Sequence, residues 1–178
     1  MMIFTLLSAI LAIFCILLSF IFFRLAAGAP KGIAAALPRW RIPGALLGII
    51  CLVWSAWHAC LLLEGPLAKF HPVIWILVPV TAVLSFIYLD YLFTRALGGF
   101  FVLMANKLLQ LGFANEVALR PLYSTACLII GVAGLFLIGT PWRLRDAFDL
   151  ASSKKNAGNA IALALILCAC VLALLPLL

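Results

Sequence analysis

The chain has 178 residues, of which 68% are hydrophobic and 10% are charged, and its formal net charge is +7. A water-soluble protein of this size cannot bury so much apolar surface in its own core, so we predict an all-α integral membrane protein, a single polytopic helical bundle over residues 1–178. The basic residues lie between the apolar runs, which argues against nucleic-acid binding and for contacts with membrane lipids.

The first apolar run covers residues 1–23. It lacks a basic segment at its start and is followed directly by Arg24, the reverse of the charge order in a secretory signal peptide. We expect it to be retained as the first spanning helix. The six cysteines of the chain lie in apolar runs and form no CxxC motif, which predicts free thiols rather than disulfides.

A basic segment, LPRWRIPG, precedes the second run. Trp40 lies between Arg39 and Arg41, and Pro38 and Pro43 prevent a regular helix through this segment. The pattern is typical of an anchor at the membrane interface whose arginines contact lipid phosphates. Docking of a soluble partner is the alternative.

One of the two histidines lies inside an apolar run and the other lies beside a proline at the start of the next run. His58 belongs to the run 44–63, about 9 Å before Glu64 at 1.5 Å per residue, whereas His71 lies at the start of the run 73–93. Two haem ligands on facing helices need nearly equal depth, so we expect neither histidine to bind haem or a metal. We expect His58 to bond a backbone carbonyl, and His71 to cap a helix end or pair with Glu64.

Asp90 is the one acidic residue inside an apolar run. A carboxylate at membrane depth is a candidate functional group by default. We predict a structural salt bridge from Asp90 to Arg95 or Lys107. Proton or cation handling is the alternative, and it lacks a second acidic residue on a neighbouring helix.

The stretch 96–113 is long enough to cross a membrane but carries Asn106, Lys107 and Gln110 on one helical face. It is either a sixth spanning helix whose polar face contacts protein, or an interfacial amphipathic helix beside five spans. Lys107 at the membrane centre costs about 2.5 to 3.5 kcal/mol on insertion scales, and contact with protein would reduce this cost.

The distribution of lysine and arginine favours the six-span alternative. With six spans and the N-terminus outside, one side of the membrane receives Arg24, Lys31, Arg39, Arg41, Arg95, Arg143, Arg145, Lys154 and Lys155. Only Lys69 and Arg120 lie on the other side. With five spans the two most basic loops fall on opposite sides, which conflicts with the positive-inside rule.

The last two runs are 121–140 and 159–178, and the segment between them is basic. After Pro141 we predict a short amphipathic turn whose Trp142, Leu144, Phe148 and Leu150 lie on the membrane. Its Arg143 and Arg145 are candidates for contacts with lipid headgroups or a partner.

Small residues in these last two runs predict close helix packing, within the chain or with another subunit. They are Gly131 and Gly134 in the first of them, and Ala160, Ala164 and Cys168 in the second.

Catalytic motifs are absent: the sequence has no GxSxG, no HExxH, no phosphate-binding glycine loop and no paired carboxylates on one helical face. We therefore predict no enzymatic activity and no cofactor. The expected function is a non-catalytic subunit that scaffolds or anchors a larger complex in the cell membrane, the inner membrane in a bacterium. Its expected contacts with other membrane subunits are Asp90, Asn106, Lys107, Gln110 and His58.

Two alternatives from other classes stay open. One is a small channel or carrier whose pathway is lined by Asp90, Asn106, Lys107 and Gln110, which ion flux in liposomes would test. The other is a haem- or quinone-binding electron-transfer subunit that uses His58, which the visible absorbance of the purified protein would test.

Overall fold

The computed structural model describes residues 2–29, 32, 36–115, 117 and 119–177; Lys31, which entered the charge count, lies outside them. The described residues form seven α-helices, three short 3-10 helices and no strand. Six of the α-helices are long and apolar enough to cross a membrane: α1 (Met2–Ala26), α3 (Arg41–Leu62), α4 (His71–Tyr88), α5 (Leu92–Ala114), α6 (Arg120–Gly139) and α8 (Lys155–Leu174). The predicted all-helical architecture with six candidate spans is confirmed for this part of the chain.

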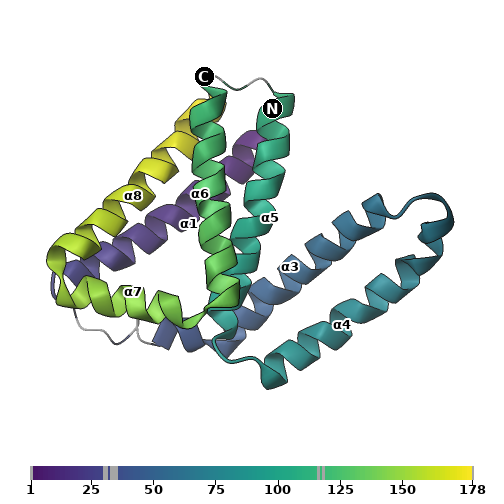
Figure 1. Ribbon diagram of the computed structural model, residues 1–178, viewed down its shortest axis with the longest axis horizontal. Helices are drawn as coiled ribbons and strands as arrows, with labels where there is room; N and C mark the ends of the chain where they lie inside the picture. Colours follow the sequence, from purple (N-terminus) through teal and green to yellow (C-terminus); the bar gives the residue numbers. More distant parts are fainter. Residues whose placement is uncertain (1, 30–31, 33–35, 116, 118, 178) are drawn as a thin grey trace.

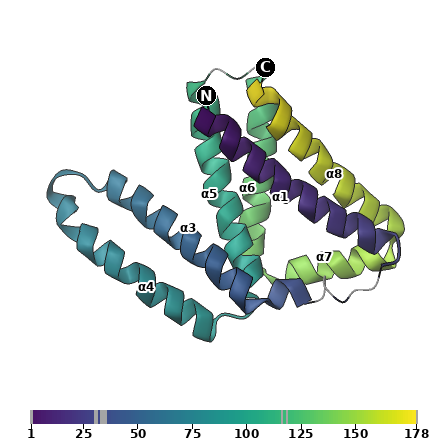
Figure 2. The same cartoon turned by 180° about the vertical axis from the view of Figure 1, so that it is seen from behind.

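The helices form a bundle and a separate hairpin (Figure 1). In the bundle α5 and α6 run side by side, α1 and α8 pack together at an angle to them, and the short helix α7 (Trp142–Ser153) lies across one end. The hairpin of α3 and α4 leaves the bundle near that same end and diverges from it (Figure 2). Both termini lie at the opposite end.

Two glycines bring α5 and α6 into backbone contact. A Cβ atom on Gly98 would lie 2.6 Å from the Gly134 carbonyl oxygen, and one on Gly134 would lie 2.7 Å from the Gly98 carbonyl oxygen. Only glycine fits at both positions of this crossing. The predicted close packing at Gly134 is therefore confirmed.

A different set of small residues joins α8 to α1. Gly158, Ala162 and Ala169 are buried on α8, whereas of the predicted residues Ala160 and Ala164 are exposed and Cys168 is half-buried, so Ala160 and Ala164 do not pack within the chain and their packing against another subunit stays a prediction. The two sets differ by about half a turn, and both repeat at helical spacing, so spacing alone does not separate them.

Two buried hydrogen bonds fix α1 within the bundle. The Ser19 hydroxyl donates to the Ala162 carbonyl oxygen of α8 at 2.9 Å. The hydroxyls of Ser8 and Tyr123 lie 2.8 Å apart and join α1 to α6.

The helix α5 packs as part of the bundle rather than along a surface. Phe100, Phe101, Met104 and Leu108 are buried on its apolar face. In its most apolar stretch 50% of the residues are buried, the largest share among the six candidate spans. A helix lying flat in an interface is covered along one side only, so this packing favours the six-span alternative for the stretch 96–113.

The helix α7 covers the ends of α1 and α8 with its apolar side. Leu144 and Phe148 are buried, and the Phe148 ring lies 5.0 Å from the ring of Phe22. The prediction that these two side chains lie on the membrane was wrong, because the helix turns them towards the bundle. Trp142 and Leu150 are exposed, as the predicted surface position requires.

The hairpin rests on the bundle mainly through α3. Gly44 of α3 packs so closely on α5 that a Cβ atom would lie 2.5 Å from the Phe93 nitrogen. The helix α4 packs mainly against α3 and contains no buried residue. One long side of α4 is therefore free of contacts with the rest of the described chain.

Candidate functional site

The polar stripe of α5, defined as Asn106, Lys107 and Gln110, lies on the surface of the chain. Asn106 and Gln110 are exposed and Lys107 is half-buried. No hydrogen bond joins any of the three to another described residue. The chain's own bundle therefore does not satisfy these side chains, and their expected contact with another subunit stays a prediction.

The stripe faces the angle between α5 and the hairpin. Nearer the N-terminus of the same helix, Leu92, Ala96 and Gly99 line a groove between α5 and the hairpin. At 100° per residue, Asn106 and Gln110 point within about 20° of the direction of Gly99. Because the hairpin diverges from α5 towards its free end, the stripe faces an open angle rather than a packed surface (Figures 1 and 2).

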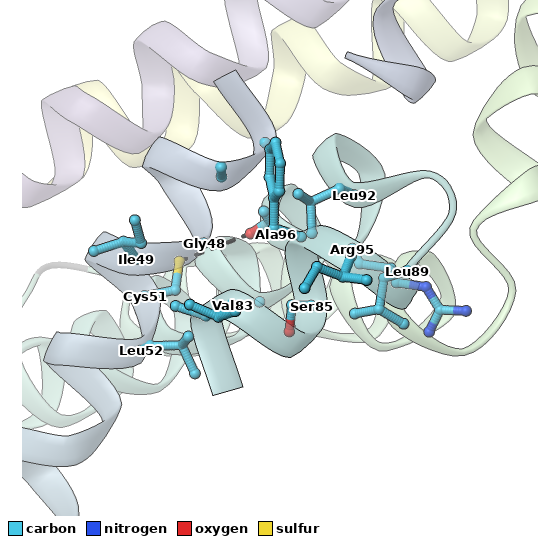
Figure 3. A pocket seen from close by; sticks show the side chains of 16 residues that line it. Gly48, Ile49, Cys51, Leu52, Val83, Ser85, Leu89, Leu92, Arg95 and Ala96 are labelled. Atoms are coloured by element: carbon cyan, nitrogen blue, oxygen red, sulfur yellow. Dashed lines mark hydrogen bonds between the residues drawn. The ribbon is translucent and has the colours of Figure 1, made fainter. Parts of the chain in front are cut away.

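The groove itself is apolar and lies where the three helices meet. Its volume is about 530 Å³, and α3, α4 and α5 all contribute to its wall. Gly48 and Cys51 of α3 pack directly on Ala96 of α5: a Cβ atom on Gly48 would lie 3.8 Å from Ala96 Cβ, and the Cys51 thiol donates to the Ala96 carbonyl oxygen at 3.7 Å (Figure 3). Small residues where α3 and α5 meet, among them Gly48, Ala96 and Gly99, therefore form a wall of the groove without filling it.

Arg95 lies at one end of this groove. Its guanidinium points past Leu89, away from Ile49 and Cys51 (Figure 3). Nη1 donates to the Ile138 carbonyl oxygen in the last turn of α6 at 3.1 Å, a favourable position for a cation. Nε is buried and has no hydrogen-bond partner among the described residues.

Asp90 lies outside the helices, in the turn between α4 and α5. The helix α4 ends at Tyr88, and the Asp90 side chain is exposed. The predicted salt bridge to Arg95 or Lys107 is not formed in the described part of the chain, since Arg95 bonds Ile138 instead. The apolar run 73–93 concealed this turn, because Leu89 and Tyr91 are themselves hydrophobic.

Tyr91, in the same turn, accepts hydrogen bonds from two arginines that are distant in the sequence. Nη2 of Arg39 and Nη1 of Arg145 each donate to the Tyr91 hydroxyl at 3.3 Å. The Arg39 guanidinium carbon also lies 5.4 Å from the centre of the Tyr91 ring, a cation–π distance. We call Arg39, Tyr91 and Arg145 the cationic cluster.

Interactions within the cluster and with Asp146 shift the pKa values of Tyr91 and Arg145. The hydrogen bond from Arg39 lowers the pKa of Tyr91, and the positive charges of Arg39 and Arg145 act in the same direction. Arg145 is also paired with Asp146 at 3.1 Å, which raises the pKa of its guanidinium. Arg39 has no such carboxylate partner in the described part of the chain.

Backbone geometry holds the cluster in place. The 3-10 helix η1 (Leu37–Arg39) is fixed on α5 by the fully buried Thr94, whose hydroxyl donates to the Pro38 carbonyl oxygen at 3.5 Å. Trp40 is extended and exposed, as predicted for a segment without a continuous helix. Tyr91 has φ 57° and ψ 40°, a left-handed conformation that is strained for a residue with a side chain.

A second hollow of about 390 Å³ lies beside the cluster. Its wall contains Arg39, Arg41, Asp90 and Tyr91. Leu89 and Leu92 line both this hollow and the apolar groove, so the two adjoin at the α4–α5 turn. Trp142 and Arg143 are exposed at the start of α7, on the same end of the molecule.

The histidines are structurally unrelated. His71 Nε2 donates to the Leu63 carbonyl oxygen at 2.9 Å, which confirms the predicted capping of a helix end, and no pair with Glu64 is found among the described residues. His58 lies on α3 with its ring 6.2 Å from that of Trp54, and the predicted bond to a carbonyl is not formed in the described structure. No group of three metal-binding side chains occurs in the described ranges.

The structure thus brings Arg39 and Arg145 together and keeps Asp90, His58 and the polar stripe apart. Sequence reasoning missed Tyr91 and Thr94, which carry no motif and gain their roles only from the tertiary fold. No protein-family model, curated protein or solved structure matches the chain.

Proposed function

We propose that the chain is a non-catalytic, multi-pass membrane subunit that docks another membrane protein against the polar stripe of α5. The supporting observation is the exposure of Asn106 and Gln110 on a helix long and apolar enough to span a membrane. Asn106 lies about 21 Å from the start of α5, within the roughly 30 Å hydrocarbon layer. Lipid offers these amides no hydrogen bonds, whereas a partner helix does.

The hairpin provides the second half of the docking surface. Gly44 of α3 packs on α5 near the start of both helices, the hairpin then diverges from α5 (Figure 1), and α4 has no buried residue, so a partner helix placed against the stripe would lie beside the hairpin. A helix seated there covers the polar stripe and one side of α3 together. This arrangement accounts for the hairpin's standing away from an otherwise well-packed bundle.

The proposal includes an orientation in the cell membrane. Arg39, Arg41, Arg143 and Arg145 gather at the end of the molecule where α7 lies, whereas Lys69 lies in the hairpin connection at the other end. By the positive-inside rule, the α7 end faces the cytoplasm.

The stripe is tested by removing its hydrogen-bonding groups. An interhelical hydrogen bond in a membrane contributes about 0.6 to 2 kcal/mol, so Asn106→Leu with Gln110→Leu weakens assembly roughly tenfold. We expect Lys107→Leu to weaken assembly as well. The measurement is a native gel of the protein purified in mild detergent, with mass spectrometry of the bands to identify the partner.

Thr125→Leu is the matched control. Thr125 is exposed on α6, and its hydroxyl already donates to the Pro121 carbonyl oxygen of its own helix at 2.7 Å. Its replacement by leucine leaves assembly unchanged. If the stripe variants also assemble as the wild type does, the stripe does not contact a partner and the proposal is rejected.

A further inference from the structure

Two hollows of opposite chemical character adjoin at the α4–α5 turn. The groove between α3, α4 and α5 is almost entirely apolar, and the second hollow is walled by Arg39, Arg41, Asp90 and Tyr91. Leu89 and Leu92 belong to both walls. We infer that the two hollows together bind one anionic phospholipid, with its phosphate against the arginines and an acyl chain in the groove.

The cationic hollow has the donors that a phosphate requires. A guanidinium carries five N–H donors, and the only polar contact of the Arg39 side chain in the described structure is its bond to Tyr91. Arg41 is exposed beside it. Arginine bonds phosphate through two parallel N–H groups, the strongest kind of charge-assisted contact available here.

The charge balance selects an anion. Among the residues that wall the hollow, two guanidinium groups face the single carboxylate of Asp90. Arg145 adds a third positive charge at the Tyr91 hydroxyl, although Asp146 offsets it. A phosphate is therefore attracted to the two arginines, and a zwitterionic headgroup gains less from them because its own cation is repelled.

The groove has the size and lining of an acyl-chain site. Its volume of about 530 Å³ falls within the range of roughly 300–1,000 Å³ typical of small-molecule sites. The wall presents Ile49, Leu52 and Val83, and its small residues keep the space open. An acyl chain suits such a space because, apart from Cys51, Ser85 and Arg95, the side chains that line it are apolar.

Arg95 supplies positive charge where the groove ends. Its one hydrogen bond goes to a neutral carbonyl, its Nε is buried without a partner, and no described acidic residue pairs with it. The same end of the groove is the start of α5, whose first-turn N–H groups carry partial positive charge. An anionic headgroup at this end compensates both.

This inference goes beyond docking of a protein partner and occupies a different part of α5. The groove ends near Gly99, and the polar stripe begins seven residues, about 10 Å, further along the helix. Lipid retention is measured on the single chain and assembly on the complex, so either proposal can fail without the other.

Native mass spectrometry of the purified chain tests the headgroup. The probes are phosphatidylglycerol and phosphatidylcholine with identical acyl chains, added to protein in mild detergent. We expect one phosphatidylglycerol to be retained about tenfold more tightly than phosphatidylcholine, and Arg39→Gln with Arg41→Gln to remove this preference. Equal retention of both lipids by the wild type overturns the inference.

A pair of neighbouring substitutions on α4 tests the groove. Ser85 lines the groove and Leu84 does not, so Ser85→Phe fills it while Leu84→Phe adds the same ring elsewhere. We expect both variants to fold, because α4 contributes no buried residue. We expect Ser85→Phe to reduce phosphatidylglycerol retention about tenfold and Leu84→Phe to leave it unchanged.

Two further outcomes identify a different occupant. If inorganic phosphate displaces phosphatidylglycerol as well as a short-chain phosphatidylglycerol does, the headgroup alone binds and the acyl-chain site is rejected. If Ser85→Phe retains the lipid but disrupts a dimer or a complex, a protein segment occupies the groove and the inference fails.

Discussion

Tyr91 shows how a single residue can organise one end of the molecule. Its left-handed backbone turns the chain sharply between α4 and α5 and brings its hydroxyl to Arg39 from one loop and Arg145 from another. A residue with a side chain adopts this conformation only when its surroundings compensate for the strain. The two arginine contacts are the compensation visible in the structure.

The titration of Tyr91 provides a prediction at this scale. Since Arg39 is the main cause of the lowered pKa, Arg39→Gln is expected to move the pKa of Tyr91 back up towards the ordinary value near 10. The measurement is NMR of ¹³C-labelled tyrosine against pH, with Tyr91→Phe for assignment. A titration that is identical in Arg39→Gln and wild type would mean that the contact does not form.

The sign of the linked stability follows from the direction of the shift. A pKa lowered on folding means that the phenolate is favoured in the folded protein. Its contribution to stability is therefore absent at neutral pH, appears as the pH rises through the folded-state pKa, and is complete above the unfolded value near 10. The difference in free energy of unfolding between wild type and Tyr91→Phe should grow over this alkaline window.

The sequence identified some residues of this end and missed others for a physical reason. Arg39 and Arg145 were predicted as surface contacts because charged residues in short loops rarely lie anywhere else. Their meeting at Tyr91 depends on a turn that apolar side chains conceal. Asp90 was expected inside a helix and lies in this turn for the same reason, because hydropathy reflects the composition of a segment and does not show where a helix ends.

Among the helices, α5 has one face that packs on another helix and one face that is polar and exposed. Its apolar face carries the close contact with α6, and its polar stripe faces the open angle beside the hairpin. The sequence placed Asn106, Lys107 and Gln110 on one helical face, and Phe100, Met104 and Leu108 are buried on the other side of the helix. The sequence did not decide whether α5 spans the membrane or lies flat at its surface, because the helices that pack against α5 determine this.

Adjacent glycines in α5 give a matched test of the helix crossing. Gly98→Ala places a Cβ atom 2.6 Å from the Gly134 carbonyl oxygen and forces the helices apart, at a cost of about 1 to 3 kcal/mol. Gly99→Ala meets nothing within 4 Å and gains helix propensity of up to about 1 kcal/mol. The measurement is the free energy of unfolding in mixed micelles, and equal values for both variants would contradict the crossing.

The predictions of which side of α7 and α8 packs within the chain failed for one reason. Leu144 and Phe148 were expected on the membrane and are buried, whereas Ala160 and Ala164 were expected in helix packing and are exposed. Lipid and protein interior are both apolar, so hydrophobic periodicity shows that a face avoids water without showing what covers it. Only the assembled bundle distinguishes the two.

For the whole molecule, the six helices divide the basic residues between two ends. Trp40 and Ser153 are exposed at the end where α7 lies, and Leu67 is exposed in the hairpin connection at the other end. In a cysteine-free background, Trp40→Cys and Ser153→Cys should react with a membrane-impermeant maleimide from the same side, and Leu67→Cys from the other. Labelling of Trp40→Cys and Ser153→Cys from opposite sides would reject six spans.

Photo-crosslinking in membranes distinguishes a polar stripe of α5 that contacts protein from one that faces lipid. A photoreactive benzoylphenylalanine at Asn106 or Gln110, activated in intact membranes, records what lies against each position. Leu167, exposed on α8 away from the hairpin, is the control. We expect protein adducts at Asn106 and Gln110 and lipid adducts alone at Leu167. Lipid adducts alone at all three positions would mean that the polar stripe faces lipid.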